Sequence, residues 1–162
     1  MMSTLTTEKD LEQLTLTFVT EFAASPTRAW QLWEDPRQLE RWWGPPTWPA
    51  TFPKHELVVG SESSYFMTGP DGERAPGWWE ITSVDAPRSL TFDDGFADEH
   101  GARTAGGPVS HLSVTLDDLD GRTRMTIISR SDTVEDLEQM VGMGMVEGMS
   151  GALSQIDTIL AD

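Results

Sequence analysis

The sequence has no cysteine, so it can form no disulfide bond and offers no thiolate for catalysis. It also has no apolar run that approaches the length of a membrane-spanning helix, which is about 20 residues. Residues 1–10 are polar and lack the basic and then apolar order of a signal peptide. These absences predict a cytoplasmic protein, with residues 1–11 as a disordered segment and residues 12–162 as a single domain.

Basic residues are scarce, because 11 lysines and arginines stand against 27 aspartates and glutamates, which gives a net charge of −16. Such a charge repels nucleic acids and anionic membranes over most of the surface, so we expect neither as a partner. The acidic residues are scattered, which favours a role in solubility over a dedicated basic partner. The hydrophobic content of 38% and the mean hydropathy of −0.35 are typical of a soluble globular protein with a core of its own.

Histidine is also rare, and His55, His100 and His111 lie on separate segments without the spacing of metal ligands. No GxSxG motif marks a catalytic serine at a nucleophile elbow. The GMG run at residues 142–144 lies inside a predicted helix rather than at a strand-to-helix turn, so it does not indicate a dinucleotide site. The sequence therefore predicts no catalytic residue, no metal ligand and no cofactor.

What the chain does have is a regular alternation of apolar and polar residues. Residues 12–22 alternate in this way and predict a strand with one wet face. Ser25-Pro26 and Asp35-Pro36 each place a proline after a capping residue, which predicts two short helices, to about residue 33 and about residue 42.

The middle of the chain predicts further strands. They cover residues 51–59, 61–68, 77–84, 89–93, 109–116 and 123–129. Residues 94–107 contain four glycines and many polar groups, so we expect a mobile loop there.

Residues 133–160 have the apolar period of one long amphipathic helix. Its middle is unusual, because residues 140–151 contain four methionines and four glycines. Each interior glycine costs a helix about 1 kcal/mol relative to alanine, so four of them cost roughly 4 kcal/mol. Glycine permits close approach by a backbone or a ligand, and methionine fills irregular apolar space. We interpret this helix as one wall of a cavity; a loosely packed core helix is the alternative.

The order of these elements predicts how they pack. A strongly twisted antiparallel sheet curls, and only the C-terminal helix is long enough to cover its apolar face. We therefore predict an α+β helix-grip fold. It consists of a curved antiparallel sheet of about six to seven strands, two short helices after the first strand, and a long C-terminal helix.

Local motifs support this fold. They include FAASP at residues 22–26, WWGP at 42–45, GPDG at 69–72, PRSL at 87–90 and GMVEGM at 144–149. In order and spacing the motifs resemble the START-like (SRPBCC) superfamily over residues 14–160. The closest branch is the one with homology to the activator of the heat-shock protein 90 ATPase. The resemblance implies the helix-grip fold but not the function, because the superfamily includes lipid binders, polyketide cyclases and co-chaperone domains.

Aromatic content is the better functional clue, because seven tryptophans in 162 residues suit an apolar cavity for an aromatic ligand. The ligand-binding residues that we predict are Trp43, His55, Tyr65, Met67, Trp79, Phe92, Met145 and Met149. Glu80 becomes a candidate acid or base only if it points inward. The period of two favours Trp79 and Ile81 inward and Glu80 outward.

These residues favour the binding of a small hydrophobic molecule, aromatic or lipid-like, without catalysis. A chaperone-associated interaction domain is an alternative by family analogy. A cyclase-like or hydrolase-like enzyme, with Glu80, His55 or Tyr65 as acid or base, is another, and a buried ionisable pair in the cavity would favour it. Met143 falls on the polar face of the predicted helix, which makes a homodimer plausible.

Overall fold

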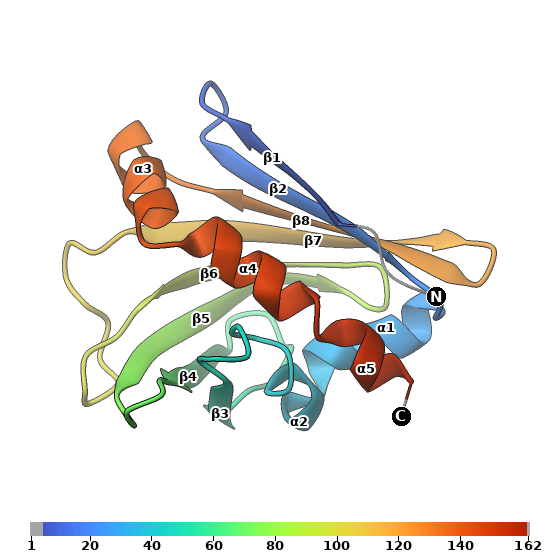
Figure 1. The fold of residues 1–162 in the computed structure, drawn as a ribbon, viewed down its shortest axis with the longest axis horizontal. Coiled ribbons are helices and arrows are strands. Elements are labelled where there is room, and N and C mark those ends of the chain that lie inside the picture. The colour runs from blue at the N-terminus through green and yellow to red at the C-terminus, as the bar shows by residue number, and fades with distance from the viewer. Residues whose placement is uncertain (1–4, 162) are drawn as a thin grey trace.

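Eight antiparallel strands form one curved sheet in the computed structural model, which describes residues 5–161 (Figure 1). The strands are β1 (Leu5–Asp10), β2 (Thr15–Phe22), β3 (Ala50–Lys54), β4 (Glu62–Thr68), β5 (Arg74–Asp85), β6 (Ser89–Phe96), β7 (Val109–Leu119) and β8 (Arg122–Arg130). Their order across the sheet is β1-β2-β8-β7-β6-β5-β4-β3. Helices α1 (Pro26–Glu34) and α2 (Pro36–Leu39) connect β2 to β3 at the far edge.

The remaining helices are α3 (Val134–Gly142), α4 (Met145–Leu153) and α5 (Ile156–Leu160). They cross one face of the sheet diagonally, and α1 and α2 lie at the end near α5 (Figure 1). This arrangement is the predicted α+β helix-grip fold. It leaves the other face of the sheet uncovered by helices.

The first strand is a correction to the sequence prediction. Disorder was expected for residues 1–11, but residues 5–10 form β1, which pairs with β2 and raises the strand count to eight. Residues 1–4 lie outside the described part of the chain. Residues 6–9 are exposed, so β1 lacks the apolar alternation that marks the other strands, and backbone hydrogen bonds to β2 hold it in the sheet.

The prediction of one continuous helix over residues 133–160 is wrong, because the segment is interrupted twice. Between α3 and α4, Gly144 has a φ of +87°, a left-handed conformation that glycine adopts without steric cost. Between α4 and α5, the side-chain amide of Gln155 donates a hydrogen bond to the carbonyl oxygen of Gly44, at 2.8 Å. The interruptions allow the segment to change direction as it crosses the sheet (Figure 1).

The centre of the core is a cluster of aromatic rings. The rings of Trp79 and Phe92 stack with centroids 4.0 Å apart. Trp33 meets Trp42 edge-on at 4.8 Å, and Trp43 meets Trp79 edge-on at 4.9 Å. Because these rings come from α1, from the residues after α2 and from the sheet, the cluster fastens the small helices to the strands.

The outer face of the sheet also buries an aromatic side chain. Trp78 is only 7% exposed, because its ring lies against Gly95 of β6 and beneath the guanidinium of Arg103, 3.7 Å from the ring centroid. Arg103 also pairs with Glu62 of β4 and Glu80 of β5. The connection between β6 and β7 is thereby tied to the strands beside it.

This tether changes the expected loop over residues 94–107. Residues 94–96 belong to β6, and Ala97 forms an isolated bridge with Arg103. The four glycines of this stretch suggested that the whole of it is a loop. The first of them, Gly95, lies in the strand instead, and the Trp78 ring occupies the space that a side chain at residue 95 would take.

Gly95→Ala should therefore lower the free energy of unfolding by about 1–3 kcal/mol, because the added Cβ would lie 2.5 Å from the Trp78 ring. Urea denaturation measures the change. Gly142→Ala is the matched control: its Cβ would meet nothing within 4 Å, so it should gain up to about 1 kcal/mol. Unchanged stability of Gly95→Ala would show that Trp78 is not held against β6.

Candidate functional site

A cavity of about 490 Å³ lies between the C-terminal helices and the inner face of the sheet. It is partly open to solvent and falls within the size range of small-molecule sites. Its walls come from α3, α4, the segment that follows α2, and strands β4 to β7.

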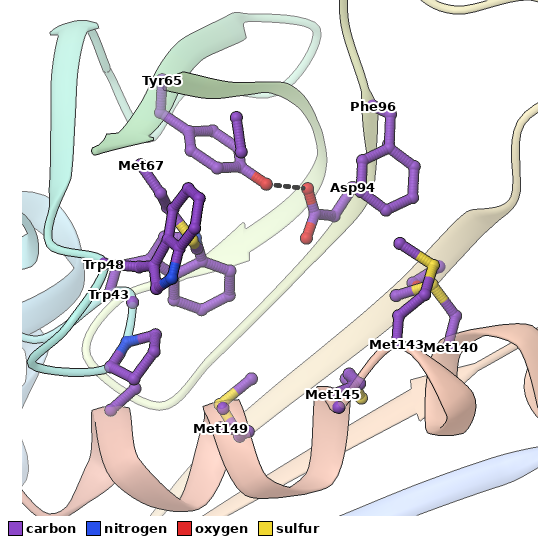
Figure 2. A pocket seen from close by; sticks show the side chains of 18 of the residues that line it. Trp43, Trp48, Tyr65, Met67, Asp94, Phe96, Met140, Met143, Met145 and Met149 are labelled. Carbon is purple, nitrogen blue, oxygen red and sulfur yellow. Dashed lines mark hydrogen bonds between the residues drawn. The ribbon is translucent and has the colours of Figure 1, made fainter. Parts of the chain in front are cut away.

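One wall carries the methionines. Met140 of α3, Met143, and Met145 and Met149 of α4 all line the cavity. Figure 2 shows them opposite Trp43, Trp48, Tyr65 and Met67, with Phe96 at a third side. Met143 is 57% exposed and also lines the cavity. The residue on the polar face that made a homodimer plausible therefore lies at the open edge of this cavity.

The four glycines of this wall do different things. Gly144 makes the break between α3 and α4. Gly151 allows close approach, because a Cβ there would lie 3.3 Å from Pro45. Gly148 lines the cavity, and a Cβ there would meet nothing within 4 Å, whereas Gly142 is exposed. Only Gly148 and Gly144 therefore keep apolar space free in the cavity wall.

The structure places the eight predicted ligand-binding residues in two groups. Trp43, Tyr65, Met67, Met145 and Met149 line the cavity. His55, Trp79 and Phe92 do not line it.

His55 makes structural hydrogen bonds instead. Its Nε2 lies 2.6 Å from the carbonyl oxygen of Trp33, so Nε2 carries the proton and Nδ1 accepts from the hydroxyl of Ser63 at 2.7 Å. Burial lowers the pKa of His55, and the hydrogen bond to Trp33 opposes this in part. A neutral histidine with both nitrogens engaged has no capacity left for a ligand.

Trp79 and Phe92 lie beneath the cavity. Both are fully buried, and Trp79 supports the rings of Trp43 and Tyr65 at centroid distances of 4.9 and 6.3 Å. Their inward orientation was predicted correctly, but the rings above them separate them from the open space. They pack against the lining residues and do not themselves line the cavity.

The polar feature of the cavity is a pair formed by Tyr65 and Asp94. The Tyr65 hydroxyl donates a hydrogen bond to Oδ1 of Asp94 at 2.7 Å, as the dashed line in Figure 2 shows. Tyr65 belongs to β4 and Asp94 to β6, so the phenol crosses β5 to reach its partner. It can do so because Gly77 of β5 has no side chain; a Cβ there would collide with the Tyr65 ring.

Burial controls the ionisation of this pair. It raises the pKa of Asp94 to about 7, and the hydrogen bond from Tyr65 opposes part of the rise. It also raises the pKa of Tyr65 well above its ordinary value, and the neighbouring Asp94 carboxylate adds to this. Near neutral pH, Tyr65 therefore keeps its proton while Asp94 is about half ionised.

The sequence interpretation missed Asp94, although a signal was present. Leu90, Phe92 and Asp94 are alternate residues of β6, so the period of two places all three on the inner face. The predicted strand stopped at residue 93, one residue before Asp94 and three residues before the end of β6. Trp48, Phe96 and Met140 were also not assigned to the cavity, which they line.

Other polar candidates lie elsewhere. Glu80 points outward and pairs with Arg103, while Trp79 and Ile81 are buried, as the alternation predicted. Within residues 5–161, no group of three or more metal-binding side chains is placed to hold an ion. In the same part of the chain, no helix combines the length and apolar character that crossing a bilayer requires.

A curved antiparallel sheet that grips a C-terminal helical segment, with a ligand-sized cavity between them, defines the START-like or helix-grip class. Within that class, the chain belongs to the family described as Activator of Hsp90 ATPase homolog 1-like protein, whose model matches residues 23–161. No curated protein matches the chain in sequence.

Solved structures from bacteria are similar to this chain. A protein of Arthrobacter aurescens is 55% identical over 96% of this chain and 91% of its own, with a TM-score of 0.93. A protein of Mycobacterium smegmatis is 49% identical over 97% of both chains, with a TM-score of 0.89. The AHSA1 protein of Silicibacter pomeroyi shares the fold at 24% identity and a TM-score of 0.72, over 91% of this chain and 97% of its own.

The unusual ionisation of Asp94 predicts a pH-dependent effect of Asp94→Asn on stability. The folded pKa of about 7 lies above the ordinary value of 3.8, so the folded protein binds the proton more tightly than the unfolded chain. Stability from this group is fully present below about pH 4 and is lost as the pH rises toward 7. Relative to wild type, Asp94→Asn should gain up to about 3 kcal/mol between about pH 5 and about pH 8.

Urea denaturation of both proteins at the two pH values measures this gain. General charge repulsion affects both proteins alike and cancels in the difference between them. A difference that stays constant with pH would contradict the raised pKa of Asp94.

Proposed function

We propose that the protein binds a small, largely apolar molecule in the cavity between α3–α4 and the sheet. The observation that supports this most directly is the composition of the wall: methionine, tryptophan, phenylalanine and proline side chains around one hydrogen-bonded polar pair. Pockets of this kind bind through apolar contact and orient the ligand through a few polar groups.

The state of the C-terminal helices supports the same proposal. A Cβ at Gly148, which lines the cavity, would meet nothing within 4 Å. The position is nevertheless occupied by the residue that weakens a helix most after proline. Methionine side chains adapt to ligands of irregular shape. A wall that is both under-filled and adaptable suits a guest molecule better than it suits tight packing.

The pair of Tyr65 and Asp94 favours a second candidate function, an enzyme that uses acid–base chemistry. A carboxyl group with a pKa of about 7 can both donate and accept a proton near neutral pH. The mass of a molecule retained from the cell separates the two functions. If the molecule that the protein releases has the same mass as the molecule that it bound, the protein only binds. If the mass of the molecule changes with time in the presence of the protein, the protein is an enzyme.

Gly148→Leu tests the binding proposal with the neutral fluorescent probe phenylnaphthylamine. The wild-type protein should enhance the fluorescence of the probe and gain about 1.4 kcal/mol of stability at ten times the dissociation constant. The leucine side chain occupies the cavity, so Gly148→Leu should weaken binding by about tenfold or more, while its own stability is unchanged or higher.

Gly142→Leu is the matched control, because Gly142 is exposed, has equal space around it and does not line the cavity. It should leave the affinity for the probe unchanged. Equal affinity of Gly148→Leu and wild type would contradict binding at this cavity.

A further inference from the structure

Resting on the binding function proposed above, we propose that the preferred ligand is an apolar amine, held by an ion pair between its ammonium group and the carboxylate of Asp94. The carboxyl group is the single ionised group that the described cavity wall presents near neutral pH, since the other titratable residue of the wall, Tyr65, keeps its proton. The affinity of the cavity for a ligand should therefore depend on the sign of the ligand's charge.

Asp94 has unused capacity as a hydrogen-bond acceptor. Its Oδ1 accepts from Tyr65, and no described residue donates a hydrogen bond to its Oδ2. Among residues 5–161, no lysine, arginine or histidine lines the cavity. Arg103 lies over Trp78 on the outer face, and Arg74 lies over the ring of Phe66. A cationic partner for Asp94 must therefore come from outside the described wall.

The rest of the wall suits a cation with an apolar body. Trp43, Trp48, Tyr65 and Phe96 present aromatic rings to the cavity, and the faces of such rings attract ammonium groups. The methionine wall supplies polarisable sulfur and apolar contact for the remainder of the molecule. A carboxylate beside aromatic rings stabilises a protonated amine by charge and by cation–π contact together.

The protein as a whole also favours a cation. Its net charge of −16 raises the local concentration of cations and lowers that of anions. An apolar acid would be repelled first by the negative charge of the surface and then by the carboxylate of Asp94. An alcohol would meet no repulsion, but its hydrogen bond to the carboxylate lacks the contribution of a second charge.

Few groups other than the ligand can influence the charge of Asp94. On the sheet, its partners in register are Trp79 of β5 and Ser110 of β7, and neither titrates in the neutral range. Asp93 and His111 bond to each other on the opposite face. The residues with which the C-terminal helices line the cavity are methionines, glycines and Ala152, and none of them titrates. Glu147 of α4 is exposed and does not line the cavity.

Three probes with the same aromatic body and polar ends of similar size test the proposal: naphthylethylamine, naphthylethanol and naphthylacetate. At about pH 8.5 the amine should bind at least about tenfold more tightly than the alcohol, and the acetate should bind most weakly. At about pH 5.5 Asp94 is protonated, so the preference for the amine should fall to about twofold or less. Calorimetric titration of the wild-type protein measures all six affinities.

Two variants locate the effect. Asp94→Asn should lose most of the preference for the amine over the alcohol, and the preference that remains should no longer change between the two pH values. Tyr65→Phe keeps the carboxylate but removes the hydrogen bond that lowers its pKa, so the preference for the amine should persist and its pH midpoint should move upward. A change of packing alone would not move this midpoint.

The outcomes separate this inference from the binding function on which it rests. If the alcohol binds but the amine binds no more tightly at about pH 8.5, the amine preference is overturned and binding stands. If Asp94→Asn retains the preference, Asp94 is not its source and the inference is again overturned. If phenylnaphthylamine and all three probes fail to bind, the binding function itself is overturned.

Discussion

The C-terminal segment and the curved sheet cannot touch along their whole length, and the rest of the site depends on this constraint. Around α5 and α1, large aromatic side chains fill the space between helices and strands. Around α3 and α4 the filling stops, because Gly144 redirects the segment and Gly148 adds no side chain.

The aromatic cluster turns this gap into a shaped site. Trp79 and Phe92 stack in the core, and Trp43 and Tyr65 stand on them as part of the wall. Buried rings with several neighbours have little freedom to rotate, so this side of the cavity is rigid. The opposite side consists of unbranched methionines on short helices, which can adapt. For the proposed binding function, one rigid wall and one adaptable wall would orient a set of related ligands in the same way.

The sequence predicted the fold better than it predicted the site, and particular residues show why. The alternation of apolar residues located β2, and the capping residues located the starts of α1 and α2. In the structure, the side chains of Ser25 and Asp35 accept the expected backbone hydrogen bonds. A resemblance of ordered motifs then selected the helix-grip arrangement. Neither signal could show that Gly144 would adopt a left-handed conformation, because glycine inside a helical pattern looks the same whether it continues the helix or ends it.

The site required information that a single strand pattern does not carry. Alternation predicted that Trp79 faces inward, and Tyr65 and Phe92 were expected to line the cavity with it. These signals could not tell the layer that contacts the cavity from the layer beneath it. The same alternation could have placed Asp94 on the inner face, because Asp94 follows Leu90 and Phe92 at every second residue of β6. Alternation could not have predicted that Asp94 pairs with Tyr65. That contact crosses β5 at Gly77 and depends on the register of β4, β5 and β6.

Asp94 is the residue that packing alone does not explain. Burial of its carboxyl group disfavours the charged form, and an asparagine could accept the same hydrogen bond from Tyr65 without that cost. A carboxyl group in a cleft whose pKa is strongly raised by burial is a candidate for a functional site. Tyr65 stabilises the ionised form without supplying a positive charge, so the carboxylate stays available near neutral pH and still lacks a counter-ion. In a protein with a net charge of −16, the inside of the cavity then has the same sign as the outside, and a cation meets an attractive field along its whole path.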